Sequence, residues 1–250
     1  MASELQVYRE LQKYLDRLPK GYPPTKSGVE IRILKHLFTP EEAQMALQLS
    51  MMPETLERIY KRVKRTGISK DELEKMLDDM FVKGLILRET KGEVKKYSNA
   101  LFAIGMYEFQ VNRLTPDFAK DCEQYLDEAF GKEFHRTKIP QLRTIPIEKS
   151  ISVEHAIGNY DSIRRIIEEN DGPFGVANCV CRQEKDLTGE SCSHTDLRET
   201  CLSLRDAVEM YTSMGIGRAI SKEEALDILD KAQEAGLVLQ PMNSLNPVAI

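Results

Sequence analysis

Apolar residues recur at helical spacing in the first stretch of the chain. Between Glu4 and Leu18 they form one stripe, made of Leu5, Tyr8, Leu11, Tyr14, Leu15 and Leu18. This stripe predicts an amphipathic helix that ends before the break KGYPP at residues 20–24. We expect the helix to pack on its own domain, and a homodimer through the same N-terminal helix is the alternative.

Two helix-start signals and a hairpin follow. Thr39–Glu42 and Ser69–Glu72 both fit the S/T-x-x-E capping box. After a predicted helix at residues 70–83, the apolar run 85–87, the turn RETKGE and the segment VKKYSNALFAI predict a β-hairpin. Helices followed by such a hairpin predict a winged-helix-like helical domain over residues 1–135.

The end of this domain, residues 109–134, is predicted to be helical. Its apolar positions are Phe118, Cys122, Tyr125, Leu126 and Phe130. Because Cys122 keeps their spacing, we expect it to be a small core residue. The segment KIPQLRTIPIE, with two prolines, then predicts the passage into a second domain.

The pattern of the remaining residues, 136–250, changes to alternating strands and helices. We expect strands at 144–151, 174–182, 199–204 and 237–240, helices at 160–170 and 222–235, and an extra helical turn or two at 207–213. Ser221 and Glu224 cap the second helix, and Gly236 stands where a C-terminal glycine belongs. The βαββαβ order predicts a ferredoxin-like domain. The expected fold class is therefore α+β.

Composition and charge narrow the classes of function. A chain of 250 residues with 41% hydrophobic content can bury a core, and the N-terminus lacks both a signal-peptide pattern and a membrane-length apolar run. We therefore expect a cytoplasmic protein with no membrane contact. The net charge of -5 gives no general attraction to nucleic acid. The predicted helix 70–83 is also rich in carboxylates, so nucleic-acid binding would depend on the basic run Arg58, Lys61, Arg62, Lys64, Arg65 and the pair Lys95 and Lys96.

Four of the five cysteines fall between residues 179 and 201. In an extended strand Cys179 and Cys181 would project from one face, with Cys192 on the connecting loop and Cys201 on the neighbouring strand. Clustered thiols in a reducing compartment are typical of metal ligands. Thiolates are soft ligands that bind zinc or hold iron–sulfur clusters.

The spacing of these cysteines leaves the metal open. It reads C-x-C, ten residues, C, eight residues, C, which matches neither zinc ribbons nor bacterial ferredoxins. An iron–sulfur cluster (4Fe-4S), zinc, and metal-free or disulfide-forming cysteines all remain open. Arg182 and Arg198 could offset the thiolate charge and donate hydrogen bonds, and His194 is either a substitute ligand, a neighbour of the ligands or a solvated loop residue.

Long segments of the chain carry a resemblance to a known family. They are GVEIRILKHLFTPEEA, SNALFAIGMYEFQVNRLT, QYLDEAFG, RTIPIEKSI, VANCVCRQEKDLTGESC, DLRETCL and GRAISKEEALDILDKAQEAGLVLQP. The chain resembles the N-terminal region of a 4Fe-4S ferredoxin-type iron–sulfur binding protein family of anaerobic bacteria and archaea. The resemblance implies electron transfer and places the motif cysteines at Cys179, Cys181, Cys192 and Cys201. Members usually continue into a ferredoxin module with C-x2-C-x2-C-x3-C-P ligands, so we expect this chain to be truncated before that module.

Three functions follow as expectations. The first is an accessory electron-transfer protein that binds an iron–sulfur centre and docks a redox partner protein. The second is a metal- or redox-sensing winged-helix transcription regulator, and the third is a zinc-stabilised structural or interaction module. No nucleophile–base pair or phosphate-binding loop is evident in the sequence, so an electron carrier or accessory subunit is expected rather than an enzyme.

Overall fold

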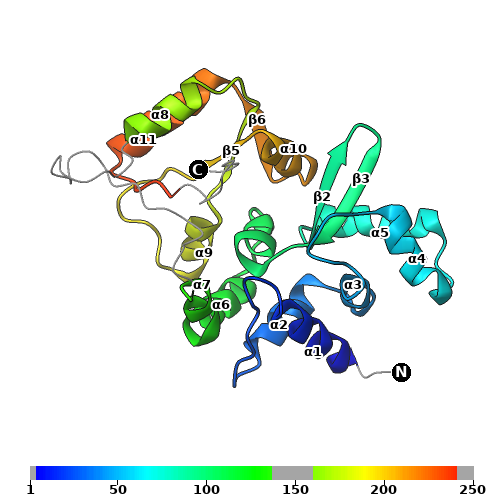
Figure 1. The fold of residues 1–250 in the computed structure, drawn as a ribbon. Helices are drawn as coiled ribbons and strands as arrows, with labels where there is room; N and C mark the ends of the chain where they lie inside the picture. Colours follow the sequence, from blue (N-terminus) through cyan, green and yellow to red (C-terminus); the bar gives the residue numbers. More distant parts are fainter. Residues whose placement is uncertain (1–3, 137–159, 241–250) are drawn as a thin grey trace. The chain divides into compact units, whose positions relative to one another are not determined.

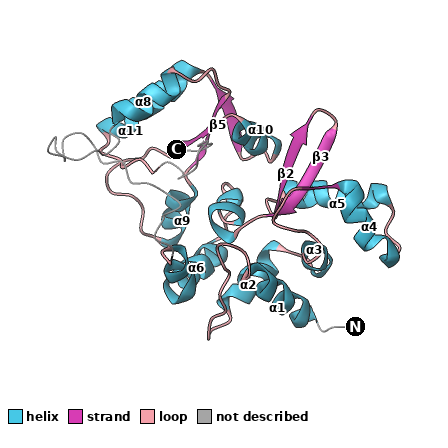
Figure 2. Cartoon of the chain, in the orientation of Figure 1, coloured by secondary structure: helices cyan, strands magenta, loops and turns pink. Residues whose placement is uncertain are grey.

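The structure is a computed structural model that describes residues 4–136 and 160–240. The described residues form two compact units, residues 4–136 (unit 1) and residues 160–240 (unit 2). Each unit combines helices with a three-stranded antiparallel sheet (Figure 2), which confirms the α+β class. The predicted interdomain segment KIPQLRTIPIE and the predicted strand 144–151 lie outside the described residues.

Unit 1 runs from dark blue to green in Figure 1. Its main elements are α1 (Glu4–Leu15), α2 (Val29–Leu37), α3 (Pro40–Ala46), β1 (Glu54–Thr55), α4 (Leu56–Val63), η1 (Lys64–Thr66), α5 (Lys70–Val82), β2 (Ile86–Lys91), β3 (Val94–Asn99), α6 (Pro116–Tyr125) and α7 (Gly131–Phe134). The irregular segments Phe102–Met106 and Glu108–Gln110 connect β3 to α6, and the wide turn Leu126–Phe130 joins α6 to α7.

The helix starts in this unit follow the sequence closely. Thr39 and Ser69 each accept a hydrogen bond from the backbone N–H three residues later, and the glutamate there accepts from the cap N–H. Both predicted capping boxes are therefore confirmed. The stripe of α1 is buried within unit 1 at Tyr8, Leu11 and Leu15. A homodimer through this helix stays a prediction.

Three strands of unit 1 form a sheet in the order β1-β3-β2. The hairpin pairs from Ile86 opposite Asn99 to Lys91 opposite Val94, as the sequence predicts. Asp78 of α5 links the helix to both hairpin strands, because it accepts hydrogen bonds from Arg88 (2.9 Å), Lys95 (2.7 Å) and Tyr97 (3.0 Å). Helix α5 and the hairpin are thus joined by charge as well as by packing.

The predicted helix at residues 109–134 begins later than expected. Helix α6 starts at Pro116, with the Thr115 hydroxyl accepting from the N–H of Phe118 (3.3 Å). Proline at the first helical position has no N–H to satisfy, so the Thr-Pro pair sets this start. Cys122 has no exposed surface, which confirms its expected place in the core.

Unit 2 carries the four clustered cysteines. Its elements are α8 (Tyr160–Glu168), β4 (Phe174–Asn178), α9 (Val180–Thr188), β5 (Glu199–Leu204), α10 (Asp206–Ser213), β6 (Gly217–Ile220) and α11 (Lys222–Glu234). The sheet order is β5-β4-β6, with both pairs antiparallel. Strand β4 is therefore the middle strand.

The two faces of this sheet are covered by different helices. Alternate residues Phe174 and Val176 of β4 and Leu202 and Leu204 of β5 form a buried core with residues of α8 and α11. The opposite face is covered by α10, and a Cβ at Gly175 would lie 3.1 Å from Val208 of that helix. The core thus fixes β4 and β5, whose ends lead into the cysteine segment.

Two sequence expectations for unit 2 are wrong, and one strand was not predicted. The strand expected at 174–182 ends at Asn178, and α9 begins at Val180. Residues 237–240 contain only an isolated bridge at Leu239, which packs against the core. The strand β6 was not expected, because its four residues GRAI are only partly buried or exposed and show no alternation. Among the described residues, no helix is long and apolar enough to cross a membrane.

Candidate functional site: the cysteine segment of unit 2

Cys179 stands at the junction between strand β4 and helix α9. Its extended backbone places it at the N-cap of α9, and its N–H donates to the carbonyl of Arg198 (2.7 Å). Cys181 lies in the first turn of the helix and is exposed. The expected geometry, two thiols on one strand face, is therefore wrong, but the two residues remain neighbours at a helix start.

The side chain of Cys179 has a lowered pKa. A thiolate there is stabilised by the thiol of Cys181 first, and then by the N–H and charge of Arg182 and the N–H of Cys181. These interactions outweigh burial and lower the pKa of Cys179 to about 6. Cys179 is then mostly a thiolate at neutral pH.

Arg182 of α9 connects this helix to the chain that leads into β5. Its guanidinium donates to the carbonyl of Leu197 (3.0 Å) and to the hydroxyl of Thr200 (3.2 Å). The same positive charge lowers the pKa of both Cys179 and Cys192. The sequence expectation that Arg182 offsets thiolate charge therefore agrees with its position in the structure.

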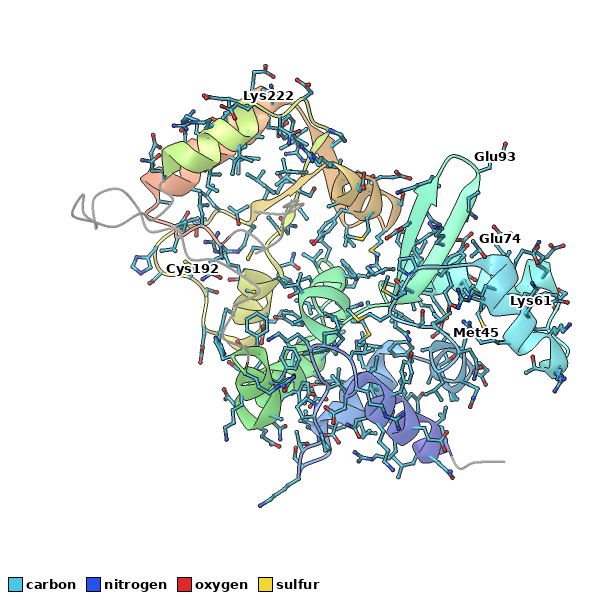
Figure 3. All side chains as sticks on the ribbon, viewed as in Figure 1. Met45, Lys61, Glu74, Glu93, Cys192 and Lys222 are labelled. Atoms are coloured by element: carbon cyan, nitrogen blue, oxygen red, sulfur yellow. The ribbon has the colours of Figure 1, made fainter. Side chains whose placement is uncertain are left out.

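Cys192 lies on the loop between α9 and β5, where Figure 3 labels it. The N–H groups of His194 and Thr195 stabilise its thiolate, and the charges of Arg182 and Arg198 add to this effect, so the pKa of Cys192 is lowered. The loop therefore places a second thiol with raised acidity close to Arg182.

Cys201 lies on β5, directly opposite Ala177 of β4. The neighbouring residues Leu202 and Leu204 point into the core, so Cys201 projects toward the face that α10 covers. The register shifts between Ala177 and Asn178, next to Cys179. Cys201 is on a strand and Cys192 on the connecting loop, as the sequence predicts.

Arg198 and His194 take different parts in the segment. Arg198 forms a two-pronged ion pair with Asp186 of α9, at 2.7 and 2.9 Å, and donates to the carbonyl of Thr195 (3.2 Å). The ion pair anchors the loop on α9. The side chain of His194 is exposed, and its backbone N–H is what faces Cys192.

The donor chemistry of the segment suits a soft metal, but the arrangement gathers too few ligands. Across the described residues no three Cys, His, Asp or Glu side chains converge as a metal-holding group. Within the described residues no cysteine forms a disulfide, and the thiols of Cys179 and Cys181 are in hydrogen-bond contact. The thiols therefore suit a soft metal by their chemistry, but among the described residues they are not gathered into a four-coordinate site.

Two residues that organise the segment were not expected from the sequence. Asp186 and Thr200 bind Arg198 and Arg182, and thereby fix the loop between α9 and β5. Their roles depend on contacts between α9 and the chain 12 and 18 residues away. A pattern of local periodicity contains no signal for such contacts.

Comparisons with protein-family models, with curated proteins and with solved structures found no match to this chain.

Proposed function

We propose that this chain is an accessory electron-transfer protein whose cysteine segment, residues 179–201, binds an iron–sulfur centre. The observation that carries the proposal is the electrostatic setting of the thiols. Cys179 and Cys192 both have lowered pKa values, and both lie near the charge of Arg182. Metal centres bind thiolates rather than thiols, so acidic thiols beside a fixed cation favour ligation.

The segment would contribute ligands and charge compensation. Cys179 and Cys181 are already neighbours, and Arg182 and Arg198 supply positive charge and hydrogen-bond donors close to the thiols. Such groups set the potential of an iron–sulfur centre, which itself supplies the one-electron chemistry. Ligation by all four cysteines requires their thiols to lie closer together than they do among the described residues.

Unit 1 supports the same proposal as a docking unit. A winged-helix fold is supported by the order of its elements, which is α3, β1, α4, α5 and then the hairpin β2–β3. The sheet order β1-β3-β2 supports the same fold. In winged helices that bind DNA, the last helix enters the major groove. Here that helix, α5, exposes Asp71, Glu72 and Asp79. These carboxylates favour protein contact over DNA.

The ferredoxin-like arrangement of unit 2 is part of the proposal as well. Strands β4 and β5 are neighbours and α8 and α11 cover one face, as that fold requires. The strand predicted at 144–151 lies outside the described residues.

The test is the metal content of the protein purified without oxygen. We expect stoichiometric iron and acid-labile sulfide, with a broad visible absorption that bleaches on reduction. A colourless anaerobic sample with stoichiometric zinc would instead support a zinc-stabilised module. A sample with neither metal would leave the cysteines as free or disulfide-forming thiols and would end the proposal.

A further inference from the structure

Helix α4 and the turn η1 that follows it carry five basic residues, which differ in whether they form ion pairs. Two of these five basic residues, Arg58 and Arg62, are bound to Glu54. The other three make no ion pair within the described residues, and all three are exposed. They are Lys61, Lys64 and Arg65, which we call the basic face.

The basic face points away from the domain core. Ile59 and Val63, four residues apart, are buried and anchor α4. Successive residues of an α-helix are about 100° apart, so Lys61 lies opposite these two anchors, and Lys64 and Arg65 follow in η1, where both are exposed. Lys61 is labelled on α4 in Figure 3. The backbone under the basic face is thus fixed, while its charged side chains extend into solvent.

Positive charge on the hairpin is only partly neutralised. Lys95 binds Glu74 and Asp78, and Arg88 binds Asp78 and lies over the ring of Phe81. Lys91 and Lys96 make no ion pair within the described residues. The basic face differs from the hairpin in that its three unpaired cations lie within five residues of the chain.

An exposed apolar pair precedes the same helix. Met51 and Met52 are 37% and 73% exposed, and Met52 is the most exposed large apolar side chain of the described residues. The turn that holds them is ordered by two hydrogen bonds, from the N–H of Asn99 to the carbonyl of Ser50 (2.8 Å) and from the hydroxyl of Ser50 to the carbonyl of Met52 (2.6 Å). Methionine and arginine are enriched in protein–protein interfaces.

We propose that the basic face docks an acidic segment of a partner protein. Three free cations on one helical surface complement discrete carboxylates, and the exposed methionines offer apolar contact that a phosphate backbone cannot use. The proposal does not depend on which metal the cysteine segment binds.

The experiment measures binding of the full chain to a short, fluorescent, glutamate-rich peptide by anisotropy at low ionic strength. The test variant is Lys61→Glu/Lys64→Glu/Arg65→Glu. The matched control is Lys26→Glu/Lys120→Glu/Lys132→Glu, which makes the same change of net charge at exposed lysines of unit 1 that lie in other segments. We expect the test variant to lose about tenfold or more in affinity and the control to lose about threefold or less.

Two further measurements keep the result decisive. A neutral variant, Lys61→Gln/Lys64→Gln/Arg65→Gln, removes the charge without adding repulsion, and circular dichroism checks that each variant folds. Equal losses in the test and control variants would overturn the proposal, because binding would then reflect net charge alone. Tighter binding of duplex DNA than of the peptide, lost in the same test variant, would overturn it in favour of a nucleic-acid surface.

Discussion

Cys179 and Cys181 illustrate how one residue sets the chemistry of its neighbour. The thiol of Cys181 is the largest contribution to the lowered pKa of Cys179. In metal-free protein, Cys181→Ala should therefore raise the pKa of Cys179 above its value of about 6. The measurement is the alkylation rate of Cys179 as a function of pH, followed by mass spectrometry.

Two controls sharpen this prediction. Cys181→Ser keeps a hydroxyl donor and should shift the pH midpoint less than Cys181→Ala does. Cys201→Ala removes a thiol that is not among the main causes of this shift and should change the midpoint much less than Cys181→Ala does. The same midpoint in Cys181→Ala and in the unmodified protein would show that the contact between the two thiols is unimportant.

Glu108 in unit 1 should make stability depend on pH. Burial raises the pKa of its carboxyl to about 7 from the ordinary value of 4.5, even though it accepts a hydrogen bond from the N–H of Gly105 (2.6 Å). The folded chain then holds a proton that the unfolded chain releases between these two values. Stability should fall as the pH rises from 4.5 to about 7 and change little from this source above that.

Glu108→Gln tests this dependence. The amide oxygen can still accept the hydrogen bond, and no charge forms at high pH. We expect the variant to be more stable than the unmodified protein by about 1–3 kcal/mol at alkaline pH, and the difference to shrink as the pH falls toward 4.5. Urea denaturation at several pH values measures it. A difference that does not change with pH would contradict the assignment.

Single residues differed in how well the sequence predicted them. Cys122 could be placed in the core because it continues an apolar stripe, which is a local signal. The positions of Asp186 and Thr200 could not be predicted, because each acts on an arginine distant in the chain. Charge pairs across elements depend on the tertiary fold.

At the scale of elements, Asp78 joins α5 to the hairpin. Burial raises the pKa of this carboxyl, but hydrogen bonds from Lys95, Arg88 and Tyr97 outweigh it, and the net pKa is lowered. Asp78→Ala should therefore destabilise unit 1 by about 2 kcal/mol in chemical denaturation near neutral pH. This contribution is present above the ordinary pKa of 3.8 and is lost as the pH falls through the lower folded value.

The neighbouring residue provides a matched control. Asp79 is 58% exposed and pairs with Lys75 one turn away. Asp79→Ala should change stability by less than about 0.5 kcal/mol. Equal effects of the two substitutions would mean that the link between α5 and the hairpin does not stabilise the unit.

Helices that begin with a strong N-cap residue were predicted in the right place, and helix α9, which lacks one, was not. Thr39, Ser69 and Ser221 each cap a helix in the expected place. Helix α9 starts instead at Cys179, a weak capping residue, and the alternation of Cys179, Val180 and Cys181 fits a strand equally well. The signal for a helix was Gly189, whose φ of 85° ends α9 in the left-handed conformation.

At the scale of the whole molecule, the fold class was easier to predict than the spatial arrangement of the strands and thiols. Alternating and helical patterns in the two halves indicate an α+β chain, and both units have that composition of elements. Strand β6 was missed because short, mostly exposed strands depend on pairing with a neighbour, here β4. Whether four thiols converge likewise depends on the tertiary structure, and their spacing along the chain does not determine it.

The most direct test of the proposed function compares three proteins purified without oxygen. They are the unmodified chain, Cys179→Ser/Cys181→Ser, and Cys122→Ser, which changes a buried cysteine of unit 1. We predict iron, acid-labile sulfide and visible absorption in the unmodified chain and in Cys122→Ser, and their loss in Cys179→Ser/Cys181→Ser. A folded double variant that keeps its full iron and sulfide content, or an unmodified chain that contains none, would contradict the account.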